Sequence, residues 1–160
     1  MASSFGWAQT PPSPDGKSPE TLVSALYDVI SGPGGQARDW DRMRSLFAPG
    51  ARLTPVVRRP DGTGAFRPMT VDEYIEQNRK FLETQGFFES EVAKTTESFG
   101  GISHVFSTYE SRLKKGDKPI ARGINSIQLV HDGTRWWIAN LTWQAEGPNL
   151  PLPKKYGGAS

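Results

Sequence analysis

Apolar residues recur at helical spacing near the start of the chain. The segment PETLVSALYDVIS, residues 19–31, places a set of apolar side chains on one side: Leu22, Ala25, Leu26, Val29 and Ile30. Apolar positions repeated every three or four residues share one face of an α-helix. Ser18 can cap the start, with Pro19 at the first helical position. The segment therefore predicts an amphipathic helix.

The same spacing predicts two further helices. Asp39 can cap the short segment WDRMRSLFA, whose inward residues are Trp40, Met43, Leu46 and Phe47. Thr70 and Glu73 form a capping box before VDEYIEQNRKFLETQ, and Gly86 closes that segment. Its shared face consists of Val71, Tyr74, Ile75, Asn78 and Phe81 or Leu82.

Strand signals fill the rest of the chain. ARLTPVVRR predicts a strand in which Pro55 implies an edge or a bend, and RPDGTG after it is a hairpin-type turn. Residues 88–99, 102–114 and 119–131 predict three more strands, and RWWIANLTWQA predicts the last. Helices come first and antiparallel strands gather at the end, so the sequence predicts an α+β fold.

These segments resemble the nuclear transport factor 2-like superfamily, which includes the SnoaL-like and ketosteroid-isomerase-like proteins. The resemblance covers residues 18–146 and rests on ALYDVIS, RDWDRMRSLFAPGARL, MTVDEYIEQNRKFL and DGTRWWIANLTW. It implies a cone-shaped α+β roll, with three helices on a strongly bent, mainly antiparallel mixed sheet and a cavity open at one end. Dimers through the outer sheet face are common in the superfamily. Because the fold hosts many activities, it assigns none by itself.

The ends of the chain differ in composition from its middle. We expect residues 1–17 to be a Pro-rich flexible leader and residues 147–160 to be an extended C-terminal tail. The leader lacks the basic start and apolar core of a signal peptide, so we expect a cytoplasmic protein by default, or an exported one if a signal was trimmed. No apolar run approaches the roughly 20 residues of a membrane span.

The net charge of +2, from 19 basic and 17 acidic residues, is small. Without a basic patch, the sequence does not support nucleic-acid binding. The absence of cysteine excludes disulfides and thiol chemistry. Two histidines without clustered carboxylates do not have metal-ligand spacing, so no metal site is predicted.

The catalytic patterns of the superfamily match only in part. Tyr27 stands at the tyrosine position of the ketosteroid-isomerase pattern, but Pro55 and Ser126 replace its base and its second acid. The scytalone-dehydratase pattern needs two histidines, and here His131 falls in a predicted turn, which leaves His104 alone.

In the epoxide-hydrolase pattern, Thr108 and Glu110 replace an arginine and an aspartate. Glu110 remains as a carboxylate on a central strand, with Arg112 two residues on and Arg122 on the neighbouring strand. Facing the cavity, it could act as a base. Facing outward, it would be half of an exposed ion pair that contributes under about 1 kcal/mol.

Alternation along the central strands mixes polar and apolar residues on both faces. In HVFSTYESR, one face holds Glu110 and the other holds Tyr109. On the last strand, Trp136 and Ile138 fall on one face, and the other holds Trp137, Leu141 and Trp143. Neither face suits water, so we predict a homodimer through the sheet.

The leading functional hypothesis is a pocket that binds a hydrophobic or aromatic small molecule and needs no cofactor. The expected ligand-binding residues are Tyr27, Trp40, Tyr74, Asn78, Tyr109, Arg122, Asn125, Gln128 and Trp143. The alternative is a cofactor-independent lyase or isomerase, in which Glu110 or His104 is the base and Tyr27 is a donor. A transport adaptor or a purely structural dimer is a third class, which a filled cavity would favour.

Overall fold

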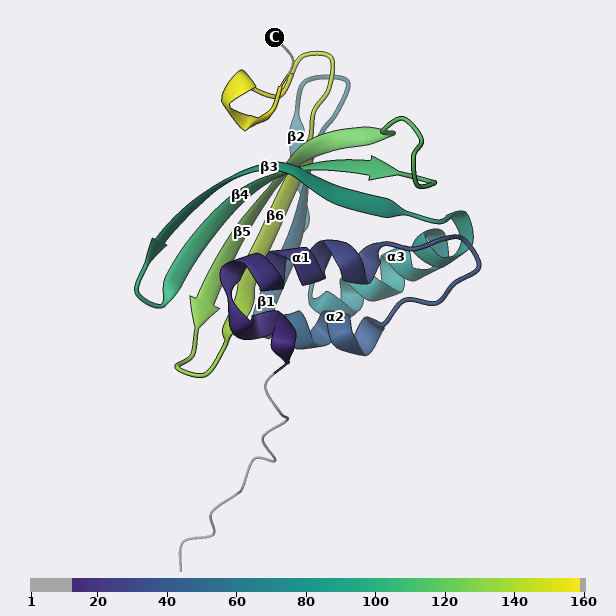
Figure 1. The fold of residues 1–160 in the computed structure, drawn as a ribbon. Helices are drawn as coiled ribbons and strands as arrows, with labels where there is room; N and C mark the ends of the chain where they lie inside the picture. The colour runs from purple at the N-terminus through teal and green to yellow at the C-terminus, as the bar shows by residue number, and fades with distance from the viewer. Residues whose placement is uncertain (1–12, 159–160) are drawn as a thin grey trace, which may run out of the picture.

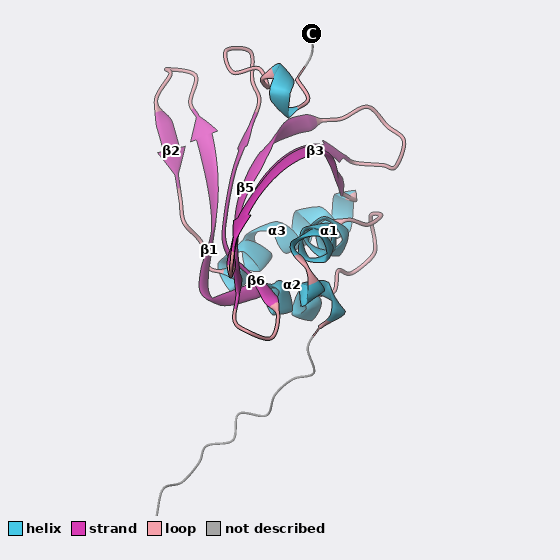
Figure 2. Cartoon of the chain, turned by 60° about the vertical axis from the view of Figure 1, so that its left-hand side comes forward, coloured by secondary structure: helices cyan, strands magenta, loops and turns pink. Residues whose placement is uncertain are grey.

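The computed structural model describes residues 13–158. Within them, three α-helices lie on one side of a six-stranded sheet (Figures 1 and 2). The helices are α1 (Pro19–Ile30), α2 (Trp40–Leu46) and α3 (Val71–Gln85). The strands are β1 (Phe47–Arg58), β2 (Gly64–Phe66), β3 (Phe88–Phe99), β4 (Ile102–Arg112), β5 (Ala121–His131) and β6 (Trp136–Ala145). Two short 3-10 helices, η1 (Pro14–Lys17) and η2 (Lys154–Tyr156), lie near the ends.

The α+β class and the order of the elements are as predicted, with β2 added as a short hairpin partner of β1. The strand order across the sheet is β2-β1-β6-β5-β4-β3. β1 runs parallel to β6, and the other pairs are antiparallel. Ser18, Asp39 and Thr70 cap the three helices as their positions in the sequence predict.

Two bulges in the sheet change which side chains face the helices. In β3, Val92 is an extra residue, because Glu91 pairs with Tyr109 while Ala93 pairs with Thr108. In β6, Ala139 is an extra residue between the paired residues Ile138 and Asn140. A bulge bends its strand and reverses the faces of the residues beyond it.

Because of the bulge in β6, the prediction that the apolar residues of the last strand fall on two faces is wrong. Ile138 and Leu141 both belong to the core, and Trp136 and Trp143 pack against it. We call the sheet face toward the helices the inner face and the opposite face the outer face. The apolar residues of β6 that were expected on two faces therefore gather on the inner one, with Trp137 outside this group.

The loop between α1 and α2 is organised by the buried side chain of Arg38. Its guanidinium donates hydrogen bonds to backbone carbonyls before, within and after the loop: Ile30 at 3.2 Å, Gly32 at 2.6 Å, Pro33 at 3.3 Å, Gln36 at 2.6 Å and Leu82 at 2.7 Å. Because Leu82 belongs to α3, Arg38 ties the end of α1 to the last turns of α3. α3 ends at Gln85 and is capped by Gly86, whose φ of 77° favours glycine, and β3 follows.

The two end segments also pack on the domain where the structure describes them. Residues 1–12 of the expected leader lie outside the described residues, whereas η1 is held by an ion pair between Asp15 and Arg42 at 2.9 Å. The C-terminal segment, residues 147–158, lies on the outer face. There Thr108 donates to the Tyr156 carbonyl at 2.7 Å and Arg122 donates to the Gly157 carbonyl at 2.9 Å.

No helix among residues 13–158 is long and apolar enough to cross a membrane.

Candidate functional site

A cavity of about 200 Å³ lies between α1, α3 and the inner face of the sheet. Aromatic side chains supply much of its wall: Tyr74, Phe81, Phe87, Tyr109 and Trp143. The ring of Tyr74 meets the ring of Trp143 edge to face, with centroids 6.0 Å apart. An apolar cavity of about 150 Å³ can hold benzene, so this cavity has room for a single ring.

Glu89, at the start of β3, brings a carboxyl group to this apolar space. Its Oε2 accepts a hydrogen bond from Ser111 at 2.9 Å, and its Oε1 accepts a longer one from the Asn125 amide at 3.4 Å. Burial raises the pKa of Glu89 to about 7, although both hydrogen bonds act to lower it. At neutral pH the carboxyl therefore exists in both protonation states, and it can accept or donate a proton.

A chain of hydrogen bonds fixes the groups behind Glu89. Asn125 also donates to the Tyr27 hydroxyl oxygen at 3.0 Å. That hydroxyl lies 2.7 Å from the Ser107 hydroxyl, which itself donates to the carboxylate of Glu91. Because the Ser107 proton is used by Glu91, Tyr27 must donate its own proton to Ser107. Tyr27 therefore orients the Asn125 amide and has no free proton for a ligand.

Glu89 also reaches a wide cleft of about 960 Å³ beside α1. Tyr27, Glu91 and Lys94 line this cleft too, and Lys94 pairs with Glu91 at 3.2 Å. The Glu89 residue keeps some accessible surface because it lines both spaces.

Tyr109 reaches the cavity because its cross-strand neighbour on β5 is Gly123. A Cβ atom at residue 123 would lie 2.6 Å from the Tyr109 hydroxyl oxygen and would overlap the Gln144 carbonyl oxygen. Only glycine therefore fits there. Burial, with the nearby charge of Glu89, raises the pKa of both Tyr109 and Tyr74, so both hydroxyls stay protonated.

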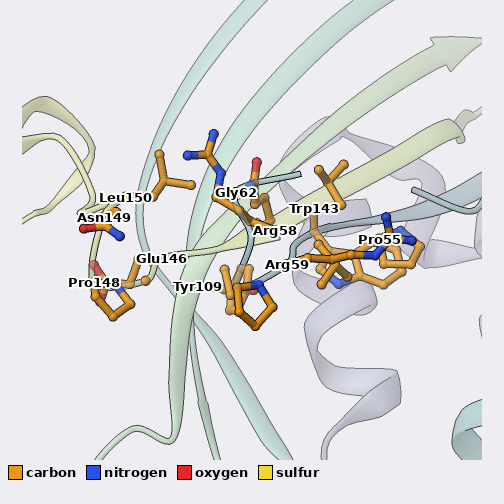
Figure 3. Close-up of a pocket in the computed structure, with 16 residues that line it drawn as sticks. Pro55, Arg58, Arg59, Gly62, Tyr109, Trp143, Glu146, Pro148, Asn149 and Leu150 are labelled. Carbon is orange, nitrogen blue, oxygen red and sulfur yellow. The ribbon is translucent and has the colours of Figure 1, made fainter. Parts of the chain in front are cut away.

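A wider groove of about 560 Å³ adjoins the cavity, and Tyr109 and Trp143 line both volumes. Figure 3 shows these two side chains together with Arg58 and Arg59, from the end of β1 and the turn after it. The C-terminal segment around Asn149 forms the other side of the groove. We call this groove the mouth of the cavity.

The structure brings together five of the nine expected ligand-binding residues. The cavity is lined by Tyr74, Asn78, Tyr109, Asn125 and Trp143. Tyr27 stands behind Asn125, as described above.

The other three expected residues lie away from the cavity. Trp40 is buried between α2 and α3, where its indole N–H donates to Glu83 at 2.7 Å. Arg122 and Gln128 lie on the outer face, because they alternate with Asn125 along β5.

Glu110 and His104 also lie on the outer face. Glu110 pairs with Arg112, and with Arg122 at 3.1 Å, while the His104 Nε2 atom lies 3.0 Å from the Ser126 hydroxyl oxygen. This corrects the expectation that one of them shares a cavity with Tyr27. The cause is the alternation of β4, which sends Ser107, Tyr109 and Ser111 inward and their neighbours outward.

Sequence reasoning missed Glu89, the group that brings acid–base chemistry to the cavity, and Ser111, which donates a hydrogen bond to its carboxyl. Glu89 lies within the predicted strand 88–99, but the pattern of that strand does not show which way its carboxylate points. A catalytic template could not reveal it, because none of the superfamily patterns described above places its base at the start of this strand.

Solved structures share this architecture. A protein of unknown function with a cystatin-like fold from Nostoc punctiforme aligns with a TM-score of 0.61 at 12% identity, over 84% of this chain and 92% of that one. A nuclear transport factor 2-like protein of unknown function from Silicibacter pomeroyi has a TM-score of 0.52 at 15% identity, over 79% and 92%. A putative ketosteroid isomerase from Parabacteroides distasonis has a TM-score of 0.53 at 12% identity, over 82% and 89%.

The chain has the nuclear transport factor 2-like fold, which is also described as cystatin-like. At these identities the likeness extends to the fold alone. No protein-family model and no curated protein matches the sequence.

Proposed function

We propose that the chain binds a small apolar or aromatic molecule in the cone cavity and holds one polar group of that molecule against Glu89. The observation that carries the proposal is a carboxyl group of raised pKa, about 7, at the polar end of an aromatic cavity. Ligand pockets commonly combine apolar walls with a few placed polar groups, and this cavity has that composition.

The geometry supports a neutral polar group on the ligand. When protonated, Glu89 can donate a hydrogen bond to a carbonyl oxygen, and when ionised it can accept one from a hydroxyl group. Ser111 and Asn125 hold the carboxyl from the other side. A charged carboxylate on the ligand would meet the ionised Glu89 at short range, which opposes its binding there.

A pair of matched probes tests the proposal. We expect p-cresol to bind about 10-fold more tightly than toluene at pH 8, because only p-cresol carries a hydroxyl group that can donate to Glu89. A hydrogen bond to a charged group contributes about 1.5 kcal/mol or more. Isothermal titration calorimetry measures both affinities. Glu89→Leu should remove the difference and keep toluene binding.

Glu97→Gln is the matched control, since Glu97 is an exposed carboxylate on the same strand. It should retain the preference for p-cresol. If the wild-type protein binds neither p-cresol nor toluene, the proposal is refuted.

A second candidate function is cofactor-independent proton transfer, as in a lyase or an isomerase. It is favoured by the pKa of Glu89, because a general acid–base works best when its pKa lies near the working pH. Glu89 takes the role that the sequence suggested for Glu110 or His104. Exchange of the α-hydrogens of cyclohexanone in D₂O measures this activity by NMR.

Glu89→Gln should lower that exchange about 10²- to 10⁴-fold, the usual contribution of a general base. Glu110→Gln should leave it unchanged, because its carboxylate lies on the outer face. Exchange no faster than in buffer would leave binding as the function.

A homodimer through the outer face of the sheet remains a prediction, and the family resemblance is now its support. One outer row that pairs across β4, β5 and β6 is polar, His104, Gln128 and Asn140, and another is apolar, Ile102, Val130 and Trp137. The other apolar residues of β6 that suggested an interface point inward instead. Light scattering should give the mass of two chains, and the mass of one chain would contradict the prediction.

A further inference from the structure

The charges differ between the cavity and its mouth. Glu89 lines the cavity, and Arg58 and Arg59 line the mouth. Both arginines are exposed, and neither guanidinium makes a hydrogen bond or an ion pair within residues 13–158. Arginine binds planar anions such as carboxylates with two parallel N–H bonds, so two unused guanidinium groups at one groove favour an anionic partner.

The acid that lines the mouth does not neutralise these arginines. Glu146 places one carboxylate oxygen 3.6 Å from Arg122, and its other oxygen accepts from the Leu152 backbone N–H at 3.2 Å. Both interactions hold the start of the C-terminal segment. Arg58 and Arg59 are therefore the charged side chains of the groove lining that have no partner among the described residues.

The mouth is continuous with the cavity and has apolar walls. Tyr109 and Trp143 line both volumes, and Pro55 and Leu150 line the groove beyond them (Figure 3). Val57 lines the groove as well. A flexible hydrocarbon chain could lie along these side chains. The cavity of about 200 Å³ holds one ring, while the mouth of about 560 Å³ has room for a chain and a head group.

We infer that the natural ligand is an amphiphilic acid, with a ring or short hydrocarbon in the cavity and an anionic head group between Arg58 and Arg59 at the mouth. This inference rests on the proposed function and adds the class of ligand and its orientation. The neutral end occupies the cavity, because Glu89 disfavours an anion there. The chain must be long enough to carry its head group past Tyr109 and Trp143.

The test compares 6-phenylhexanoate with 6-phenyl-1-hexanol at pH 8 by isothermal titration calorimetry. Wild-type protein should bind the acid about 10-fold more tightly than the alcohol, from charge-assisted hydrogen bonds at an exposed site. Raising the salt from low to high concentration should reduce that preference, because exposed charges are screened. Phenylacetate should bind more weakly than 6-phenylhexanoate, since its short chain leaves the anion inside the cavity.

The double variant Arg58→Gln/Arg59→Gln should lose the preference for the acid and keep the affinity for the alcohol. Arg52→Gln is the matched control, because Arg52 is exposed on β1 and its guanidinium donates to the Gly50 and Ala51 carbonyls away from the mouth. Circular dichroism checks that each variant is folded.

Two results would overturn the inference and leave the proposed function standing, provided that p-cresol still binds. They are equal affinity of the wild-type protein for acid and alcohol, and a double variant that still prefers the acid. If p-cresol and both phenylhexyl probes fail to bind, the proposed function and the inference fail together.

Discussion

Replacement of Arg38 by methionine should lower the free energy of unfolding by about 2–6 kcal/mol, because the buried residues Ile30 and Leu82 each lose the donor to their carbonyl, at about 1–3 kcal/mol each. Methionine fills part of the space but removes the Arg38 donor from five backbone carbonyls. The Gly32 carbonyl keeps the Phe87 N–H, and the exposed Pro33 and Gln36 can turn to water. A buried carbonyl that loses its partner costs about 1–3 kcal/mol. Urea unfolding followed by circular dichroism measures the loss.

Arg44→Met is the control for this prediction. Arg44 is an exposed arginine that pairs with Asp41 and Asp72, so its loss should cost less than about 1 kcal/mol. A similar loss in both variants would show that the Arg38 network does not hold the loop. The Arg38 variant should also weaken probe binding, because Arg38 fixes the end of α3, from which β3 and Glu89 follow.

Replacement of Glu89 by glutamine should stabilise the protein by about 3 kcal/mol at pH 8 and should change its stability little at pH 4. Each unit of difference between the folded-state and unfolded-state pKa corresponds to about 1.4 kcal/mol. The pKa of Glu89 rises from 4.5 in the unfolded chain to about 7 in the folded protein. Between these values the folded state binds more protons than the unfolded state, so the stability of the wild-type protein falls as the pH rises. The wild-type protein has lost the whole of this stability above the folded-state pKa of about 7.

Glutamine keeps the shape of Glu89 without its charge, so the variant avoids this loss. Urea unfolding of both proteins from pH 4 to pH 8 measures the difference, and Glu97→Gln should show no such trend. A stability difference that does not change with pH would mean that Glu89 is not buried as an acid. A stabilising substitution that removes function is typical of a residue kept for its chemistry.

The helices and the fold could be predicted from the sequence because their signals are local. Ser18, Asp39 and Thr70 are caps whose partners lie three residues away, and the apolar spacing that follows them sets the buried face of each helix. The aromatic residues of the cavity also follow from these faces. Tyr74 lies on the apolar side of α3 and reaches the cavity as that face predicts.

The site itself depends on two bulges that no local signal reveals. The turn at Gly100 pairs Phe99 with Ile102, and uninterrupted counting would then pair Glu89 with Arg112 on the outer face. The extra residue Val92 shifts the register by one, so Glu89 pairs with Ser111 and faces the cavity. A sequence interpretation without this bulge assigns the carboxylate of the site to the wrong face.

Strand alternation shows which of the remaining candidate residues share a face of the sheet. It does not show which face points to the cavity. Arg122 and Asn125 are three residues apart on one strand, so they cannot both line the cavity. The structure assigns Asn125 to the inner face and Arg122 to the outer face, beside Glu110. Arg38 was missed for another reason, since its partners include a carbonyl of α3, 44 residues away.

The most direct test of the site is the titration of Glu89 itself, followed by NMR through the side-chain carboxyl carbon of ¹³C-glutamate-labelled protein. Glu89→Gln identifies the signal by removing it. The carboxyl should titrate with a pKa of about 7, and the pKa should move when p-cresol saturates the cavity. A Glu89 that titrates near 4.5 and does not respond to p-cresol would contradict a ligand site built around this carboxyl.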